Sequence, residues 1–366
     1  MDLRQKSGKY VKIYNEIKHQ LLSGVFSDGD KLPTEFEYSE RFAVSRPTVT
    51  KALNELEDEG FIVRKTGSGS YVRRRKEGTR SKLFGLLIPG LGRGEIFEPI
   101  CARIASAAEM NNYSLLWSGF EKSDKMHPLS SGAIAMRYID NGASGIFFEP
   151  LELWPGFDEM NRNVIKILQD AGIPVVLIDS DYLRFPDRSG FDLVGLDNFR
   201  AGYIAARHFL EGGAARVDFL MRPNSADTVR MRVRGYGSAL FDAGIAPDPS
   251  WVHTGLPEDG AFVKGMVRER GASRVICAND ETAAAFLLAL EREGIPVPGE
   301  VGIIGFDDVR YAEHLKVPLT TVRQPCEEIG RLAMETMIWR LENPGSPPRT
   351  VLVPGTLVIR ASSGVY

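Results

Sequence analysis

The sequence predicts an α/β protein in which a small N-terminal domain precedes two doubly wound parallel sheets. Three observations favour this fold class. Residues 10–73 combine helical periodicity with a short β-hairpin pattern. From Lys82 onwards, short apolar runs bounded by turns alternate with helical patterns, which is typical of parallel βαβ units. The roughly 280 residues of this second part exceed what a single sheet usually holds, so we expect two lobes.

Composition and charge are those of an ordinary globular protein. Of the 366 residues, 43% are hydrophobic and 25% are charged. Residues 1–80 hold 16 Lys or Arg and 12 Asp or Glu, whereas the remainder holds 29 and 36. A basic segment joined to an acidic body favours a polyanionic partner for the first part only.

We expect no signal for export or membrane insertion in this sequence. Its N-terminus lacks the apolar core of a signal peptide, and no run approaches the roughly 18 to 20 apolar residues that span a membrane. Cys101, Cys277 and Cys326 lie far apart and in no metal-ligand spacing. We therefore expect reduced thiols, a cytoplasmic protein, and no membrane, metal or cofactor.

Three helices are predicted in the first domain. Apolar residues at helical spacing predict a helix over 10–22, which Ser23-Gly24 ends. Thr34 precedes Glu37 by three residues, so we expect a capping box and a short helix that runs through Phe42. Ser45 begins a third helix, and its first turn tolerates a proline because the amide groups there lack helical partners anyway.

The third helix has the side chains of a DNA-binding helix. A single stripe at i, i+3, i+4 and i+7 is apolar and predicts the buried face: Val49, Ala52, Leu53 and Leu56. Off this stripe lie polar side chains, mostly in the N-terminal half: Arg46, Thr48, Thr50, Lys51 and Asn54. Arginine pairs with guanine edges in the major groove, and hydroxyls reach phosphates or bases.

A β-hairpin is predicted after this helix. Two β-patterned runs, 61–65 and 70–73, flank a glycine-containing loop at 66–69 that follows Lys65. A tip without bulky side chains can approach a phosphate backbone closely. A helix bundle with a hairpin and no nucleic-acid role is the alternative, but the order of these elements favours DNA binding.

Residues 9–73 resemble the winged helix-turn-helix of the GntR regulators. The matching stretches are KLPTE at 31–35, VSRPTV at 44–49 and GSGSYV at 67–72. The resemblance implies that Arg46 and Thr48 contact DNA and that the tip at 67–70 enters the minor groove. Phe36 and Thr50 stand where that family often has arginine. The predicted DNA-binding residues are Ser45, Arg46, Pro47, Thr48, Thr50, Lys51, Lys65, Gly67, Ser68 and Gly69.

The segment 74–81 contains no apolar residue and is predicted to be a solvated linker. An additional phosphate contact from the arginines of 73–80 is the alternative. We therefore divide the chain into a DNA-binding domain at 1–73, this linker, and a second, larger domain at 82–366.

Eight apolar runs of the large domain are predicted to be buried strands, and the stretches between them include clear helical patterns. The strands are 83–88, 114–117, 145–148, 175–178, 194–196, 217–220, 275–277 and 301–304. The clearest helices are 100–111, 200–211, 231–243 and 281–293. Ligands of such sheets bind beyond the carboxyl ends of the strands, here between the two lobes.

Polar residues that follow these strands are candidates for a ligand site, because Asp, Asn and Arg each bind hydroxyl groups. They are Arg93, Glu95, Glu149, Asp179, Asp181, Arg222, Asn279, Asp280, Asp307 and Asp308. Four aromatic residues are candidates for an apolar face against a sugar ring, with core packing as the alternative: Phe97, Trp154, Tyr236 and Phe306. If several of these side chains converge between the lobes, they favour a polyhydroxylated ligand.

Residues 82–363 are similar to the LacI-type sensor domain, which shares its fold with periplasmic sugar-binding proteins. The motifs are VGLDN at 194–198, RVRGY at 232–236, VICAND at 275–280, VGIIGFDD at 301–308, PLTTVRQ at 318–324 and LVIR at 357–360. The resemblance implies a ligand-binding trio of Arg232, Asn279 and Asp307, with Thr228 nearby. The predicted ligand set is Arg93, Phe97, Glu149, Thr228, Arg232, Asn279 and Asp307.

The same resemblance implies a homodimer and two lobes of discontinuous chain. We expect lobe one at about 82–196 and 324–345, and lobe two at about 197–323 and 346–366. The loop at 89–97 lacks the usual Asn-Pro-Phe pattern, and a winged domain replaces the LacI-type DNA-binding domain and its hinge helix. That combination resembles the arabinose repressor type of GntR regulator.

The predicted function is therefore that of a repressor. Operator DNA would bind the first domain, and a small-molecule effector, a monosaccharide or sugar derivative, would bind between the lobes. One alternative is a solute-binding protein without regulation, which the DNA-binding module argues against. Another is an enzyme, but no phosphate-binding glycine loop, metal-ligand histidine pattern or serine nucleophile elbow appears, so we predict no catalytic residues.

Overall fold

The structure, a computed structural model, describes residues 10, 13–14, 16–18, 20–21, 26–27, 29–58, 61–65, 67–72, 82–89, 96–117, 129–152 and 156–365. It divides into two units, Met1–Ser81 and Lys82–Tyr366. The predicted linker at 74–81 and the candidates Arg93, Glu95 and Trp154 lie outside the described residues.

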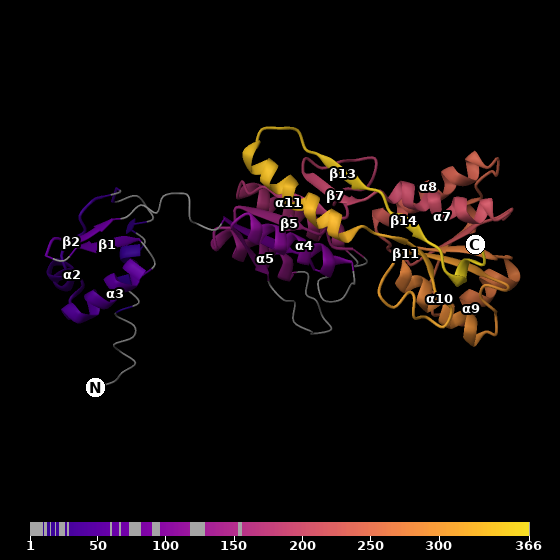
Figure 1. Cartoon of the computed structure of the whole chain (residues 1–366), viewed down its shortest axis with the longest axis horizontal. Helices are drawn as coiled ribbons and strands as arrows, with labels where there is room; N and C mark the ends of the chain where they lie inside the picture. The colour runs from indigo at the N-terminus through magenta and orange to yellow at the C-terminus, as the bar shows by residue number, and fades with distance from the viewer. Residues whose placement is uncertain are drawn as a thin grey trace. The chain divides into compact units, whose positions relative to one another are not determined.

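The first unit contains helices packed against a two-stranded hairpin (Figure 1). The described residues between 10 and 21 are helical, and they precede α2 (Glu35–Phe42) and α3 (Arg46–Asp58). Strands β1 (Ile62–Lys65) and β2 (Gly69–Val72) pair antiparallel. Both capping-box bonds predicted at Thr34 are present, and the apolar stripe of α3 is fully buried, so both predictions are confirmed.

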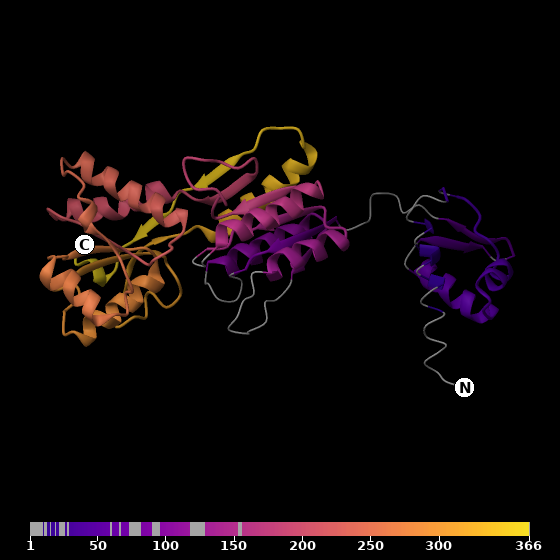
Figure 2. The same cartoon turned by 180° about the vertical axis from the view of Figure 1, so that it is seen from behind.

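The first lobe of the second unit is a six-stranded sheet in the order β13-β7-β6-β5-β3-β4, with all pairs parallel. Helices α4 and α11 bury one face of the sheet, and α5 and α6 bury the other. The reverse view in Figure 2 shows the sheet between these helices. The elements are β3 (Lys82–Leu87), α4 (Phe97–Met110), β4 (Tyr113–Trp117), α5 (Leu129–Asp140), β5 (Gly145–Phe148), α6 (Phe157–Asp170), β6 (Val175–Ile178), β7 (Asp192–Leu196), α11 (Cys326–Glu342) and β13 (Thr350–Val353).

The second lobe is also built on six strands, in the order β14-β12-β11-β10-β8-β9, and its edge strand β14 is antiparallel to β12. Helices α7 and α8 lie side by side on one face, with α9 and α10 on the other (Figure 1). The elements are α7 (Asn198–Glu211), β8 (Asp218–Met221), α8 (Asp227–Asp242), β9 (Val252–Thr254), α9 (Gly260–Lys264), β10 (Arg274–Cys277), α10 (Asp280–Arg292), β11 (Gly302–Asp307), β12 (Thr320–Arg323) and β14 (Thr356–Val358). Short 3-10 turns at Pro249–Trp251 and Ala361–Ser363 and a π-helical turn at Gly265–Glu269 complete it.

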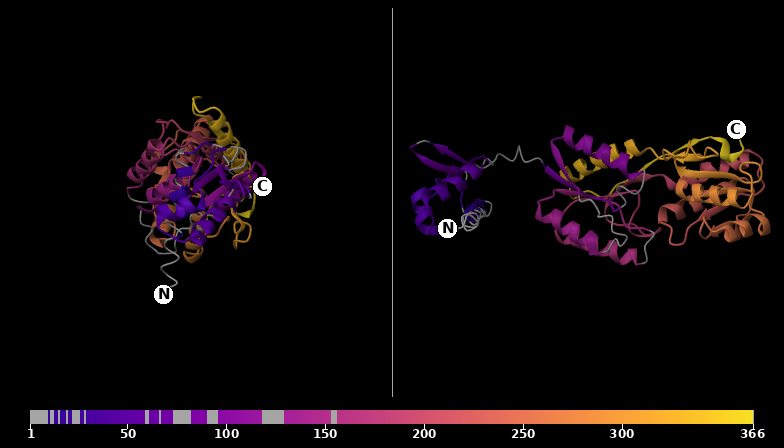
Figure 3. Two further views of the ribbon diagram at one scale, coloured as in Figure 1. Left: turned by 90° about the vertical axis from the view of Figure 1, so that its left-hand side faces the viewer. Right: turned by 90° about the horizontal axis from the view of Figure 1, so that it is seen from below.

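The chain passes between the lobes three times, after β7, after β12 and between β13 and β14, as the right view of Figure 3 shows. The assignment of all of 346–366 to lobe two is wrong. Strand β13 pairs with β7 in the first sheet, with Val351 opposite Val194. Only β14 and the residues after it join lobe two, because β13 completes the edge of the first sheet beside β7 before the chain crosses.

Among the described helices, none is long and apolar enough to cross a membrane.

Candidate functional site

The exposed face of α3 carries the residues predicted to bind DNA. Arg46, Pro47 and Lys51 are exposed, and together with Thr50 and Asn54 they line an open hollow on the helix surface. Thr50 Oγ1 donates to the Arg46 carbonyl oxygen at 3.0 Å, so this hydroxyl is partly engaged by the helix itself. Ser45 Oγ lies 2.8 Å from Thr48 Oγ1 at the start of α3.

The hairpin tip is also exposed, and it lies close to α3. Gly67 and Gly69 have φ angles of 74° and 118°, which side-chain-bearing residues rarely adopt, so the tight turn requires glycine there. Ser68 Oγ lies 2.6 Å from the Tyr71 hydroxyl. A hollow between the tip and α3 is lined in part by Arg46, Lys65, Gly67 and Gly69.

One positioning residue of this unit was missed in the sequence. Arg64, on β1, donates hydrogen bonds to Glu35 at the start of α2 and to Asn54 on α3. It therefore ties the hairpin to both helices. In the sequence, Arg64 is only a charged residue within a β pattern. That pattern does not reveal its hydrogen-bond partners, which lie 10 and 29 residues away.

In the second unit, Arg232 is the centre of a polar cluster at the carboxyl ends of the lobe-two strands. Its side chain is only 4% exposed. Nε donates to Asn198 Oδ1 at 2.8 Å, one terminal nitrogen donates to the Ala278 carbonyl oxygen at 2.6 Å, and the other lies 3.8 Å from Asp307 Oδ1. The guanidinium lies over the Phe306 ring, 4.6 Å from its centroid.

Close packing of two helices places Arg232 beside Asn198. A Cβ on Gly235 of α8 would come within 1.8 Å of the Phe199 carbonyl oxygen, and a Cβ on Gly202 of α7 within 1.9 Å of the Arg232 carbonyl oxygen. Only glycine at these positions lets the two backbones approach so closely. The first turn of α8 also holds Thr228, which is 8% exposed.

Asp307 ends β11 at a backbone φ of 114°, an angle that residues with a side chain rarely adopt and that is often found at functional sites. Its Oδ1 accepts a hydrogen bond from Gln324 Nε2 at 2.7 Å. Burial raises the pKa of Asp307 to about 6, although the nearby Arg232 charge and the Gln324 bond oppose this shift.

The third member of the predicted trio, Asn279, caps α10. Its side-chain oxygen accepts from the Thr282 amide at 2.9 Å. The preceding residue, Ala278, accepts the bond from Arg232. The structure thus brings Arg232 and Asp307 into contact and places Asn279 one residue from the same cluster.

The lobe-one residues facing this cluster are acidic. Burial raises the pKa of Asp179, which follows β6, against the lowering effect of Arg232. Burial, followed by repulsion from Asp179, raises the pKa of Glu152 to about 8, and Arg232 again opposes the shift. Both carboxyls therefore lie near enough to Arg232 to interact with its charge, across the boundary between the lobes.

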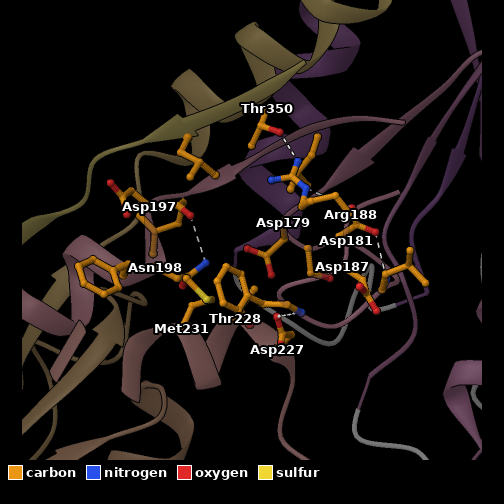
Figure 4. A pocket seen from close by; sticks show the side chains of 17 residues that line it. Asp179, Asp181, Asp187, Arg188, Asp197, Asn198, Asp227, Thr228, Met231 and Thr350 are labelled. Atoms are coloured by element: carbon orange, nitrogen blue, oxygen red, sulfur yellow. Dashed lines mark hydrogen bonds and ion pairs between the residues drawn. The ribbon is translucent and has the colours of Figure 1, made fainter. Parts of the chain in front are cut away.

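A cavity of about 130 Å³ extends from Asp179 along the ends of β7 and β13 (Figure 4). Residues of both lobes line it, among them Asp179 and Asp181 from lobe one and Asn198, Thr228 and Met231 from lobe two. The loop after β6 reaches lobe two, where the Phe185 amide donates to Asp227 Oδ2 at 3.1 Å.

The remaining predicted ligand residues are placed differently. Phe97, at 9% exposure, packs in the core of the first lobe. Glu149 is half-buried, and its amide donates to the Leu87 carbonyl oxygen at 3.0 Å. The aromatic candidates Tyr236 and Phe306 are both in the core of the second lobe. No group of three or more His, Cys, Asp or Glu able to hold a metal ion occurs within the described ranges.

Known protein families match both the first domain and the larger second domain of the chain. Residues 9–72 match the family described as bacterial regulatory proteins, gntR family, and residues 206–363 match the periplasmic binding protein-like domain. The ribose operon repressor of Haemophilus influenzae is 30% identical over 297 residues, covering 80% of this chain and 84% of the relative. The chain belongs to the GntR-type transcriptional regulators with a LacI-type sensor domain.

Other known proteins match this regulator over most of its length. The arabinose metabolism transcriptional repressor of Geobacillus stearothermophilus is 28% identical over 346 residues, which is 91% of each chain. Among solved structures, the regulator CelR in complex with cellobiose matches at 21% identity and a TM-score of 0.65, covering 87% of this chain and 90% of that one. A LacI family regulator from Enterococcus faecium with bound ribose matches at 21% identity and a TM-score of 0.61, covering 77% and 98%. At this identity the structures show the fold, which confirms the predicted fold class.

Three residues that interact with Arg232 or Asp307 were missed in the sequence: Glu152, Asn198 and Gln324. Asn198 and Gln324 were inside motifs that carried the resemblance, but no pattern showed that they hold Arg232 and Asp307. Glu152 lies four residues beyond the end of β5, further than the strand-end positions that were considered.

Proposed function

We propose that this transcriptional regulator is a repressor whose operator affinity is controlled by a small polar effector, a monosaccharide or sugar derivative, bound around Arg232. The observation that carries the proposal is the pairing of Arg232 with Asp307 at the end of β11. A guanidinium donor beside a carboxylate acceptor suits two adjacent hydroxyl groups, as in a sugar. The names of the relatives, which are repressors of arabinose and ribose genes, support the same class of effector.

The ligand site would use Arg232, Asn279, Asp307 and Thr228 from lobe two. Glu149 and Arg93 are proposed from lobe one, whereas the burial of Phe97 makes it a weaker contact than the polar residues. Arg232 is held by Asn198 and the Ala278 carbonyl before any ligand arrives. A donor that is already oriented avoids an entropic cost on binding.

Operator DNA would bind the exposed face of α3 and the hairpin tip. Arg46 and Thr48 are proposed base or phosphate contacts, supported by Ser45, Pro47, Thr50 and Lys51. Lys65 and the residues at 67–69 would meet the minor groove. We assign the DNA-binding domain to 1–73, the linker to 74–81 and the sensor domain to 82–366.

A homodimer is proposed because two DNA-binding domains on one assembly recognise a palindromic operator. An apolar groove of about 710 Å³ on α10 and the segment before β12 is proposed as part of the interface. Its lining includes Leu287, Leu288, Ile295 and Leu315, and Leu288 is 48% exposed. In sedimentation experiments, Leu288→Glu should shift the protein towards monomer, and an unchanged dimer would remove this face from the interface.

Effector binding would change the angle between the lobes and thereby lower operator affinity. Such coupling is reciprocal, so operator DNA should weaken effector binding by the same factor. The test is fluorescence anisotropy of a labelled operator with a panel of monosaccharides, together with calorimetric titration of the active sugar with and without operator. Equal sugar affinity in both titrations would refute the coupling. Recovery of each sugar unchanged after incubation is expected of a cytoplasmic regulator without enzymatic activity.

A further inference from the structure

Phe36 is the one large hydrophobic side chain left exposed in the described part of the first unit. It is 57% exposed and lies in the first turn of α2. Tyr38, two residues further along the same helix, is completely buried. Because successive residues of an α-helix are rotated by about 100°, these two side chains lie on nearly opposite sides of α2. The packing of Tyr38 into the core therefore directs Phe36 away from it.

The first turn of α2 is fixed by its capping box. The Thr34 amide donates to Glu37 Oε2 at 2.6 Å, and the Glu37 amide donates to Thr34 Oγ1 at 3.2 Å. Both exchanges lie within the turn that carries Phe36, so its backbone is held in one conformation. An exposed apolar group on a fixed backbone is suited to a defined contact with a partner.

The same turn is tied to the proposed DNA-binding face of α3. Arg64 donates hydrogen bonds to Glu35, next to Phe36, and to Asn54 on α3. Glu35 and Arg46 also line the same hollow between α2, α3 and the hairpin. Phe36 is therefore adjacent to a residue that borders the proposed interface with operator DNA, and two independent contacts hold it there.

Thr50 supplies a second apolar group on this face. Its Oγ1 donates to the Arg46 carbonyl oxygen at 3.0 Å, so the hydroxyl hydrogen is used within α3. What remains is an acceptor oxygen and a methyl group, and the oxygens of a DNA phosphate cannot donate to an acceptor. Thr50 lines the exposed hollow of α3 together with Arg46, Pro47 and Lys51. Its methyl group is thus available to a base edge.

We propose that Phe36 and the Thr50 methyl group recognise thymine in the operator through apolar contacts with its C5-methyl group. The inference rests on the proposed function and specifies what the DNA-binding unit recognises. Among the groups that base edges present in the major groove, the thymine methyl is the apolar one, and Phe and the Thr methyl group are side chains that contact it. Each half-site would then carry thymines near the base that Arg46 contacts.

The test compares thymine with uracil, which forms the same base pair but lacks the C5-methyl group. The operator is first selected from a random double-stranded library with the full-length protein. It is then synthesised with deoxyuridine in place of every thymidine, and both duplexes are titrated by fluorescence anisotropy. We expect the uracil duplex to bind at least about 10-fold more weakly, at about 4-fold for each buried methyl group. Single replacements then locate the thymines that matter.

Two pairs of variants assign these thymines to their side chains. Phe36→Ala should remove the effect of uracil at one position of each half-site, whereas Phe36→Leu, which keeps an apolar side chain, should retain part of it. Thr50→Ser keeps the hydroxyl and loses the methyl group, so it should remove the effect at a different position. Thr50→Val keeps the methyl group and should preserve the dependence on thymine.

Phe241→Ala is the matched control, because Phe241 is 74% exposed on α8, outside the DNA-binding unit, and its change should leave both affinities unaltered. A thermal melt of each variant checks that it is folded. Equal affinity for the two duplexes, with binding still dependent on Arg46, would overturn the inference alone. A uracil effect that persists undiminished in Phe36→Ala and Thr50→Ser would also overturn it, and Phe36 would then face another protein surface. Failure to select any preferred sequence would overturn the proposed function and the inference with it.

Discussion

Arg232 and Asn198 are joined by a hydrogen bond of 2.8 Å that ties helix α8 to the first residue of helix α7. The two residues are 34 positions apart in the sequence. Asn198 thereby determines the direction of the guanidinium. The side-chain Nδ2 of Asn198 in turn donates to the Leu196 carbonyl oxygen at 3.1 Å. The orientation of the central ligand-binding candidate thus depends on the segment where the chain leaves β7.

Asn198→Ala should weaken effector binding by about 10-fold, because a hydrogen bond to a charged group contributes roughly 1.5 to 3 kcal/mol and Arg232 would lose one of its two firm acceptors. Calorimetric titration of the active sugar measures the effect. Operator affinity without sugar should stay at the wild-type value. Arg207→Ala, an exposed change on the same helix, is the control, and equal losses in both variants would remove Asn198 from this role.

Gly235→Ala should reduce both stability and effector affinity, because the added methyl group would meet the Phe199 carbonyl oxygen and force α7 and α8 apart. We expect a loss of about 2 to 4 kcal/mol in the free energy of unfolding, measured by urea denaturation. Gly237→Ala provides a matched comparison two residues away, where nothing lies within 4 Å of the new atom. That variant should be stabilised by up to about 1 kcal/mol, since alanine favours a helix over glycine.

Glu152→Gln should stabilise the protein increasingly as the pH rises. The folded chain holds the Glu152 proton up to a pKa of about 8, whereas the ordinary value is 4.5, so folding takes up a proton between these values. Burial is the main cause of the raised pKa, Asp179 and Asp227 add to it, and Arg232 and Ser180 oppose it. Wild-type stability is therefore lost as the pH rises from 4.5 to 8.

The gain from Glu152→Gln should be near zero at pH 4.5 and reach about 1 to 3 kcal/mol at pH 8, since one pKa unit corresponds to about 1.4 kcal/mol. Melting curves at pH 5, 6, 7 and 8 measure it. A constant difference between variant and wild type across this range would contradict the assignment.

Arg46→Ala should lower specific operator affinity by about 10- to 100-fold and leave sugar binding unchanged, because a bidentate contact to a base edge contributes roughly 1 to 3 kcal/mol. Anisotropy titrations at several salt concentrations measure the loss and the change in salt dependence. Arg162→Ala, an exposed arginine on α6, should have no effect. Intact operator binding by Arg46→Ala would exclude α3 as the recognition helix.

Asp192→Asn should destabilise the first lobe by about 2 to 4 kcal/mol. The fully buried Asp192 carboxylate accepts from Arg340 Nε at 2.6 Å and from the Arg349 amide at 2.7 Å, so it joins the end of α11 to the segment before β13. The Arg340 guanidinium, with its charge uncompensated, would remain largely buried. Urea denaturation measures the loss, with the exposed Asp170→Asn as control.

Helices and strands with a strong local sequence pattern could be predicted from the sequence. Short strands whose position depends on pairing with neighbouring strands could not. The run at 175–178 coincides with β6, since four consecutive apolar β-branched or leucine residues have few alternatives. Strands β9, β12, β13 and β14 were not among the predicted strands, because they are three or four residues long and contain polar side chains such as His253, Thr320 and Thr350. Their position depends on neighbouring strands, which a local pattern does not contain.

The same distinction holds in the cleft. Arg232, Asn279 and Asp307 were named as ligand candidates because they lie in motifs that carry the family resemblance. Asn198 and Gln324 act through side chains 34 and 17 residues away, and such partners emerge only when the sheet is assembled. Glu152 lies four residues beyond the end of β5, and a local pattern does not show that the charge of Asp179 acts on it.

Because the chain crosses between the lobes three times, neither half of the sensor is a continuous stretch of gene. A fragment that ends at Leu196 would contain five strands of the first sheet but lack α11 and β13, which cover and close it. The sensor can therefore be transplanted only whole, whereas the DNA-binding unit is attached by a single covalent connection before β3. Exchange of the DNA-binding unit by recombination needs one junction, whereas exchange of the second lobe would need three and exchange of the first lobe four.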